Sequence, residues 1–447
     1  MDNINAAVLA SATAAARRAG YYARNNPWIS AAVASLVSNA VGSGIKPRSR
    51  HADPKVREAL HTLWDRWTNQ ADGAGLADFY GLQALAVRAM IEGGESFARL
   101  RDAGPGAVPL TIELLDREQV PLDHFSDLRL ESRVRAGIEF DADGRRCAYH
   151  VLTARPGDPF APLAGLSYQT VRIPGADICH LFQPLAAGQL RGLTWLAPVL
   201  LRLHELDQFE DAALVRAKVA ALFAGFIRDL DGTAAGQASA GNTLNGILEL
   251  GMEPGSLIPL PAGADITFSN PAETKDYGPF TKSHIRAIAM GLGVPYENVS
   301  GDLEGVTYSS IRAGLVEFRR RIEQLQHNVV VFQFCRPVWE RFVRNAVLSG
   351  ALPVRDFEAD SASYLAVDWL PPRFDWVDPL KDARAEIEQI NAGLKSRSQS
   401  IAERGYDAED VFRQIATDQR MTADLGIAFA PPVATAAAWP TAPETAP

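Results

Sequence analysis

Two pairs of side chains stand close enough in the sequence to do chemistry. Glu92 and Glu95 flank a Gly-Gly pair, and two neighbouring carboxylates can serve as a general acid and a general base. Cys179 and His180 are adjacent on an expected strand, and both residue types bind zinc. We favour a solvated helix end for the glutamates and a packing role for the Cys-His pair, because no second ligand cluster stands at a suitable spacing.

Three other groups of residues suggest binding. Asp302 and Glu304 lie in the Gly-rich segment YENVSGDLEGVTYSS and could bind a cation, but we favour an exposed mobile loop. The run 319–321 consists of three arginines, which point in three directions on a helix, so intersubunit salt bridges or solvent exposure are favoured over a nucleic-acid contact. Trp369 and Trp376 could stack a base, although packing at a domain junction is favoured.

Motifs of common enzyme classes are absent from the sequence. It has no phosphate loop, no HExxH, no GxSxG and no GxGxxG between a strand and a helix. Cys147, Cys179 and Cys335 form no CxxC pair, which excludes a zinc ribbon or a disulfide framework and favours a reducing compartment. We therefore expect no catalytic residue, no cofactor and no bound metal. An enzyme with a dispersed site that uses Asp302 or His180 stays as an alternative.

The overall composition is that of a soluble protein with a mixed fold. The chain has 447 residues, of which 47% are apolar and 22% charged, enough for roughly three domains. A net charge of -9 argues against tight DNA binding, which draws on many Lys and Arg contacts, but permits a wall along which DNA slides. Neither a signal peptide nor an uninterrupted apolar run of about 18 residues is present, so secretion and membrane insertion are not expected.

The first half of the chain predicts helices on both sides of a β-rich unit. An N-terminal arm contains two helices with a break near Asn26. Asp53 and Pro54 predict the start of an amphipathic helix, and a further helix is expected over residues 76–91. Short runs bounded by Gly, Pro and Asp over residues 95–182 predict strands. The fold class is therefore α+β.

The second half predicts long amphipathic helices. We expect a helix over residues 195–223, a small β unit over 224–272, a helix over 274–292 and a loop over 295–309. The strongest periodicity follows, with apolar residues at alternating steps of four and three and with Pro337 as an expected kink or break. This seam consists of Ile311, Leu315, Phe318, Ile322, Leu325, Val329, Phe332, Cys335, Trp339, Phe342 and Ala346. By itself it would also suit a coiled-coil scaffold or adaptor, which has no need of the β-rich unit.

Several segments, taken in order, resemble the lambda-type phage portal proteins. They are RNNPWISAAVASLVSNAVGSGIKP, RGLTWLAPVL, GLGVPYENVSGD, YSSIRAGLVEFRRR and WVDPLKDARAEIEQINAGLKSRSQSIAERGYDAEDV. Together they extend from about residue 20 to about residue 420. Each is a helix start or a loop without catalytic residues, so the resemblance rests on their order and coverage.

The resemblance implies a portal fold with an α/β wing, a two-helix stem, a small β-containing clip and a helical crown. Mapped by order, the parts are an N-terminal arm (1–49), the wing (50–192), stem helix 1 (193–223), the clip (224–272), stem helix 2 (273–293), a tunnel loop (294–309), a long wing or crown helix with its return segment (310–375), the crown (376–425) and a disordered tail (426–447).

The resemblance also implies a function. Portals of this kind are dodecameric rings at one capsid vertex, through which double-stranded DNA is packaged and ejected without sequence specificity. The implied partners are the terminase large subunit, the major capsid protein or scaffold, and head-tail adaptor proteins; the ring belongs to the virion, is assembled in the bacterial cytoplasm and contacts no membrane. The residues expected to face DNA are Asp302, Glu304, Thr307 and Tyr308. The apolar seam from Ile311 to Phe332 is expected to give neighbouring subunits a surface to cover.

Overall fold

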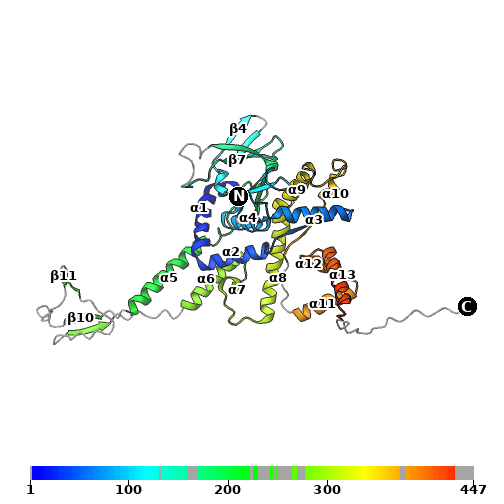
Figure 1. Cartoon of the computed structure of the whole chain (residues 1–447). Coiled ribbons are helices and arrows are strands. Elements are labelled where there is room, and N and C mark those ends of the chain that lie inside the picture. The colour runs from blue at the N-terminus through cyan, green and yellow to red at the C-terminus, as the bar shows by residue number, and fades with distance from the viewer. Residues whose placement is uncertain are drawn as a thin grey trace.

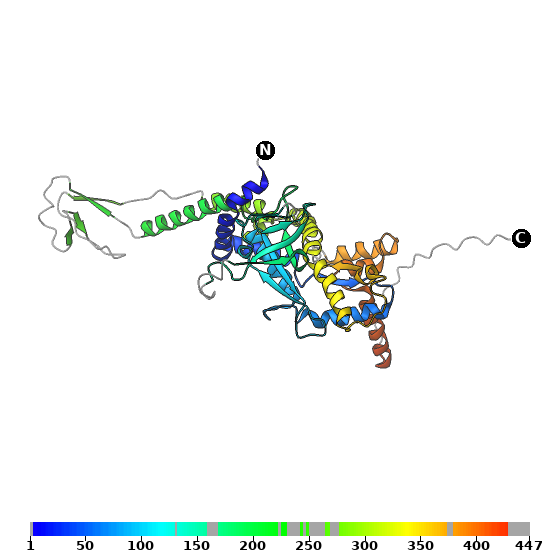
Figure 2. The same cartoon turned by 90° about the horizontal axis from the view of Figure 1, so that it is seen from above.

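The computed structural model describes residues 3–129, 132–158, 169–221, 225–229, 242–244, 247–249, 264–268, 277–372 and 379–427. Helices and two larger sheets form a central body, and one long helix leads away from it to a group of short strands (Figures 1 and 2). A helical unit built from the C-terminal part of the chain lies on the other side of the body (Figure 1). The predicted α+β fold class is confirmed.

The first two helices belong to the core of the body. Asn26 separates α1 (Ile4–Asn25) from α2 (Pro27–Ala40): its backbone N–H donates to the Tyr22 carbonyl, and its side chain accepts from the Ile29 amide. Fully buried residues of α2 include Ile29, Ala32, Val33 and Leu36. The segment predicted to be an N-terminal arm thus contributes the apolar face of α2 to the main core.

Capping residues set the limits of the next two helices. Asp53 caps α3 (Pro54–Thr68), with Pro at the first helical position as predicted. The helix α4 (Phe79–Gly93) begins later than expected, because the side chain of Asp78 accepts from the Gly81 amide. It ends at Gly94, whose φ of 93° is left-handed.

The β-rich unit spans residues 95–182 as predicted and contains two antiparallel sheets. The first has the order β3-β2-β9, with β2 (Glu95–Arg101) between β3 (Thr111–Leu115) and β9 (Ile178–Phe182). The second runs β4-β5-β6-β7-β8, formed by Ser126–Arg129, Ser132–Arg135, Ile138–Phe140, Arg146–Leu152 and Thr170–Pro174. Short 3-10 turns follow β3 and precede β9, at Arg117–Gln119 and Gly175–Asp177.

The strongest sequence periodicity forms one continuous helical rod with three parts. They are α8 (Tyr308–Leu325), a π-helical segment η4 (Gln326–Cys335) and α9 (Arg336–Leu348). The break expected at Pro337 is absent. Pro337 stands in the first turn of α9, directly after the wider π turns, in which the Arg336 amide donates to the Val331 carbonyl.

The remaining elements close the body and form the C-terminal unit. The strand β1 (Lys46–Ser49) pairs with β14 (Val367–Leu370), which follows α10 (Ser361–Leu365). The C-terminal helices are α11 (Pro379–Asn391), α12 (Arg397–Glu403) and α13 (Ala408–Asp424). The sequence predicts helices over about 379–394 and about 407–417; it does not predict α12, and α13 is longer than expected. Apart from its first two residues, the tail expected to be disordered lies outside the described residues.

In the parts of the chain that the structure describes, none of the helices combines the length and the apolar character that a membrane span requires.

Candidate functional site

The helix pair α5 and α6 forms the base of the projecting part of the molecule. The helix α5 (Leu200–Ala221) starts after Pro198 rather than at residue 195, because the ring of a proline disfavours helical geometry at the residue before it; the expected end at residue 223 lies outside the described residues. Near the body, Leu203 and Leu206 are buried, whereas Leu214 and Val215 are more than half exposed. The far half of α5 therefore extends beyond the core of its own subunit.

The second helix of the pair, α6 (Tyr277–Leu292), is held to α5 by aromatic rings. Phe209 stacks on Tyr277 with a centroid distance of 5.7 Å and lies 4.4 Å from the Phe280 ring. Past the tip of α5 the described segments are strands: β10 (Gly225–Asp229) pairs with β13 (Ala264–Phe268), and β11 (Asn242–Leu244) pairs with β12 (Ile247–Glu249). Strands are what the sequence predicted for residues 224–272.

The segment RGLTW fastens the start of α5 to the body. The Trp195 amide and the Thr194 hydroxyl both donate to the Ile91 carbonyl near the end of α4, at 3.1 Å and 3.2 Å. A Cβ on Gly192 would lie 2.1 Å from the carbonyl oxygen of Gly94, so only glycine fits there. The orientation of α5 therefore depends on backbone contacts with α4.

A buried ion cluster lies directly beside these contacts between residues 192–195 and the end of α4. The carboxylate of Glu95 receives three hydrogen bonds from Arg191, one from the Gly192 amide and one from Arg117. Burial alone would raise the pKa of Glu95, but its attraction to Arg191 and a hydrogen bond from His180 hold that pKa well below its usual value. The expectation of a solvated helix end is wrong for Glu95, because its side chain is fully buried in β2; Glu92 pairs with Arg88.

His180 completes this cluster as a neutral ring. Its Nε2 lies 3.1 Å from Glu95, which can only accept, and its Nδ1 lies 2.9 Å from Arg146, which can only donate. Burial lowers the pKa of His180 to about 4 and raises the pKa of the Cys179 thiol to about 12. Both groups are engaged in packing, as the sequence interpretation favoured, and neither is presented to a ligand.

The loop that was expected to be mobile is partly helical and anchored. Residues 296–300 form α7 (Tyr296–Ser300), which begins after Pro295 and ends at the left-handed Gly301. The Asn298 amide group donates to the Ser35 hydroxyl of α2 at 3.2 Å. The expectation of a loop over the whole of 295–309 is therefore wrong, because Pro295 favours helix initiation and α2 supports the resulting turn; residues 301–307 form the remaining loop.

Asp302 and Glu304 lie together in this loop and share a cationic partner. The Lys282 ammonium of α6 is 2.6 Å from a carboxylate oxygen of Asp302 and 3.7 Å from one of Glu304. Asp302 also accepts from the Tyr296 hydroxyl at 3.2 Å and from the Glu304 amide at 2.9 Å. Hydrogen bonding from Lys282 lowers the pKa of Asp302 to about 2, so the carboxylate is ionised at neutral pH.

The other two expected loop residues stand where the loop meets α8. The Thr307 carbonyl accepts from the Ile311 amide at 3.1 Å, at the start of α8. The side chain of Tyr308 lies outside the described residues. The sequence interpretation missed Lys282, which stands twenty residues before Asp302. The two residues are close in space because the chain reverses its direction through α7, after the end of α6.

Most of the apolar seam packs inside its own subunit. Phe318, Ile322, Leu325 and Val329 belong to the main core, and α8 contacts α2. Phe332 is 61% exposed, because the wider turns of η4 rotate the apolar face, and Phe334 is buried instead. The described burial thus assigns four of these seam residues to folding of the subunit; a seam between subunits stays a prediction for Ile311 and Leu315, which are half-buried, and for Phe332.

The arginine run divides into exposed and packed members. Arg320 is exposed and lies 3.9 Å from Glu317. Arg321 instead donates to the Leu292 carbonyl at 2.9 Å and lies over the Trp195 ring, and burial lowers its pKa. The expected solvent exposure is therefore wrong for Arg321, which links α8 to the end of α6. Trp369 packs against the core on β14, and Trp376 lies outside the described residues.

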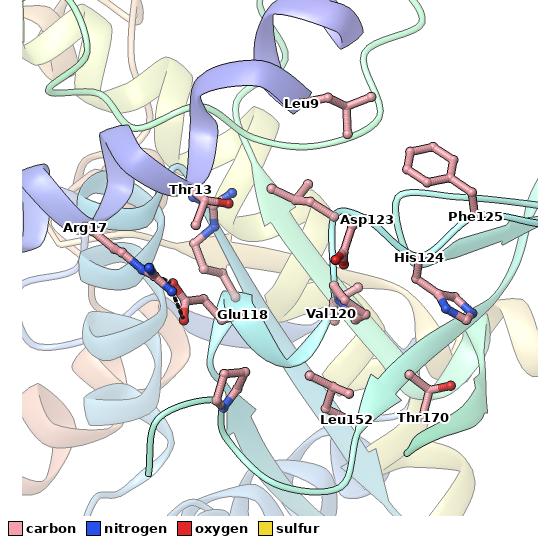
Figure 3. Close-up of a pocket in the computed structure, with 14 residues that line it drawn as sticks. Leu9, Thr13, Arg17, Glu118, Val120, Asp123, His124, Phe125, Leu152 and Thr170 are labelled. Atoms are coloured by element: carbon pink, nitrogen blue, oxygen red, sulfur yellow. Dashed lines mark hydrogen bonds and ion pairs between the residues drawn. The ribbon is translucent and has the colours of Figure 1, made fainter. Parts of the chain in front are cut away.

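Two other places in the structure were considered as sites: a group of possible metal ligands and a surface groove. Among the described residues, one set of possible metal ligands lies within 4.8 Å: His61, Asp407 and Asp410. Asp407 is already paired with Arg48 at 3.2 Å and caps α13. A groove of about 700 Å³ lies between α1 and the second sheet, bordered by Leu9, Phe125 and the Arg17–Glu118 ion pair (Figure 3).

Comparison with known proteins gives consistent matches. Residues 2–326 match a family model described as phage portal protein, lambda family. The chain is 28% identical over 404 residues to the probable portal protein of Halomonas phage phiHAP-1, covering 88% of this chain and 77% of that protein. It is 26% identical over 312 residues to portal protein B of Escherichia phage lambda and 27% identical over 308 residues to the portal protein of Escherichia phage N15, covering in each case 63% of this chain and 57% of the relative.

Solved structures with a similar chain include the neck of the native gene transfer agent particle, with 17% identity and a TM-score of 0.46 over 86% of this chain and 91% of that one. The neck of the empty particle has 18% identity and a TM-score of 0.49, over 87% and 92%.

Proposed function

The chain belongs to the lambda family of phage portal proteins, and from that premise we propose that it closes into a ring at one vertex of a phage capsid. Double-stranded DNA passes through the ring during packaging and ejection. The observation that carries this proposal is the extent of the family match, which includes both projecting helices, the strands between them and the loop 301–307. The ring itself is proposed as a dodecamer built from copies of this chain.

In this proposal each part of the subunit has a place in the ring. The body with its sheets is the wing, α5 and α6 form the stem, and the strands β10 to β13 form the clip. The loop 301–307 lines the channel, and α11 to α13 form the crown. The projection supports the stem assignment, because Leu214 and Val215 of α5 are more than half exposed and a neighbouring copy would cover them.

DNA passes this ring without being bound by sequence. The chain has a net charge of -9, and an acidic surface repels phosphates, so the duplex is not held tightly along the channel. Asp302 and Glu304 are proposed to face the duplex. The apolar periodicity of the helix 308–348 was the feature that suggested a coiled-coil scaffold. Most of these apolar residues pack in the core of their own subunit, and this disfavours the scaffold alternative.

The ring is proposed to act by position rather than by catalysis. His180 is buried, and Asp302 is held by Lys282 and Tyr296 in an arrangement that shows no nucleophile or general base directed at a substrate. The terminase large subunit supplies ATP hydrolysis and docks at the clip, and head-tail adaptor proteins replace it there after packaging. The major capsid protein or scaffold holds the wing. The assembled ring is proposed to form in the bacterial cytoplasm and to remain in the virion.

A packaging experiment tests this function. Phage that lacks the gene for this chain should assemble capsids without DNA, and supplying the gene in trans should restore filled capsids. The measurement is the amount of nuclease-protected DNA per capsid. Normal filling of capsids in the absence of the chain would contradict the proposal.

A further inference from the structure

A cavity of about 650 Å³ beside α6 carries two cations and an unused hydroxyl. Lys282 and Arg286, one helical turn apart, both line it and lie over the ring of Tyr296, at 5.9 Å and 5.2 Å from its centroid. Thr281 lines the same cavity, and its buried hydroxyl oxygen has no hydrogen-bond partner within the described parts of the chain. Two cations beside a free hydroxyl form the donor set that a phosphate group needs.

Carboxylates of the loop occupy the mouth of this cavity. Asp302 contacts Lys282 at 2.6 Å and Glu304 lies 3.7 Å from the same ammonium. A carboxylate and a phosphodiester both present anionic oxygens to an ammonium, so they compete for it. Glu304 is exposed for 87% of its side chain, so its pair with Lys282 is screened by water and exchangeable. The side chains of Lys282 and Asp302 are 29% and 30% exposed, so a phosphate can also approach the closer pair.

We propose that Lys282, Arg286 and Thr281 form a binding site for a backbone phosphate of duplex DNA, which Asp302 and Glu304 fill when no DNA is present. The inference rests on the proposed function, since a ring brings this site to the DNA. Exchange of a carboxylate for a phosphate leaves the number of ion pairs at Lys282 unchanged. Each subunit therefore makes one weak phosphate contact with the duplex. Weak contacts allow the DNA to move during packaging and help to retain it afterwards.

The test compares charge-neutral loop variants in the assembled, full-length protein. D302N/E304Q removes both negative charges from Lys282; because an amide has one oxygen, position 302 then keeps only one of the two hydrogen bonds that Asp302 accepts from Tyr296 and from the Glu304 amide. The expected result is several-fold tighter binding of a fluorescently labelled duplex by anisotropy, with a log–log salt dependence that changes by about one per added phosphate contact. Adding K282Q to this variant should abolish the gain.

The control is E297Q, which removes one negative charge, against two in D302N/E304Q, from a residue of α7 that does not line the cavity. It should leave duplex affinity nearly unchanged. An equal gain in E297Q, or a gain in D302N/E304Q that persists with K282Q, would mean a general charge effect and would overturn the site.

A second measurement on the unaltered protein guards against misfolding of the variants. Hydrogen exchange at residues 302–307 should become faster when duplex DNA is added, because the phosphate releases the loop. No change in exchange would overturn the proposal, and the same release by inorganic phosphate at an equal phosphate concentration would assign the site to free anions instead of DNA. Native mass spectrometry is done first: rings without the expected DNA effects refute this site alone, whereas the absence of rings refutes the proposed function.

Discussion

Arg191 and Glu95 form a buried, two-pronged ion pair, with Nη2 2.7 Å from Oε1 and Nε 2.9 Å from Oε2. Glu95 opens β2, and Arg191 lies in the segment that leads into α5. The pair therefore joins the sheet of the body to the base of the projecting helix. In a ring, this joint would transmit the position of the wing to the stem.

Replacing Glu95 by glutamine should destabilise the subunit strongly. It leaves Arg191 and Arg117 buried without a compensating charge, and breaking a buried pair in this way costs about 3–5 kcal/mol. The measurement is the free energy of unfolding from urea denaturation. The matched control is E92Q, three residues earlier on the chain, whose pair with Arg88 is partly exposed and should cost less than about 1 kcal/mol. Equal losses in the two variants would contradict the assignment.

Stability should fall as the pH decreases from about 6.5 to about 4. The pKa of His180 is about 4 in the folded chain and near its ordinary value of 6.5 when unfolded. Between these values the unfolded chain binds a proton that the folded chain does not, so stability is full above this window and is lost as pH falls, by up to about 1.4 kcal/mol per pH unit. The low pKa of Glu95 adds a loss in the same direction at lower pH.

An H180N variant separates this contribution from the rest. Asparagine keeps hydrogen-bonding groups but does not titrate, so the slope of unfolding free energy between pH 6.5 and 4 should flatten relative to the unaltered chain. Urea denaturation at several pH values gives both slopes. An unchanged slope would show that another group causes the acid loss.

Gly293 and Gly301 should respond differently to alanine. Both have a φ of +66°, but a Cβ at Gly293 would lie 0.9 Å from the Arg321 guanidinium, whereas nothing lies within 4 Å of one at Gly301. G301A should cost only the backbone strain of about 1–2 kcal/mol. G293A should cost more, because Arg321 must also leave the Leu292 carbonyl. Thermal denaturation compares the pair, and equal losses would contradict the packing described for Arg321.

Deleting residues 300–306 should impair packaging or retention of DNA while rings still assemble. The deletion removes Asp302 and Glu304 but leaves the core residues of α8 in place. Nuclease-protected DNA per capsid measures the first effect, and native mass spectrometry of the purified variant measures the second. Unchanged packaging would refute the assignment of this loop to the channel.

Local signals in the sequence predicted the elements well. Asp53 and Pro54 set the start of α3, and the runs of residues 95–182 are the strands of the two sheets. These features depend on the conformational preferences of residues only a few positions apart, which can be read from the sequence alone. The resemblance of ordered segments supplied the family, because it needs no knowledge of contacts.

Long-range partners explain what the sequence interpretation missed. Glu95 looked like a solvated helix end because its partner Arg191 lies far away in the chain. Lys282 was not recognised because only the turn through α7 brings it to Asp302. At Phe332 a regular helical period was assumed, and the π turns of η4 shifted the buried face to Phe334.

Electron microscopy of the purified chain tests the central claim most directly. Negatively stained particles should show rings with an axial hole wide enough for a duplex, with the α5–α6 stems side by side around it. Particles that remain single compact subunits at micromolar concentration, or that assemble without a central opening, would contradict the account.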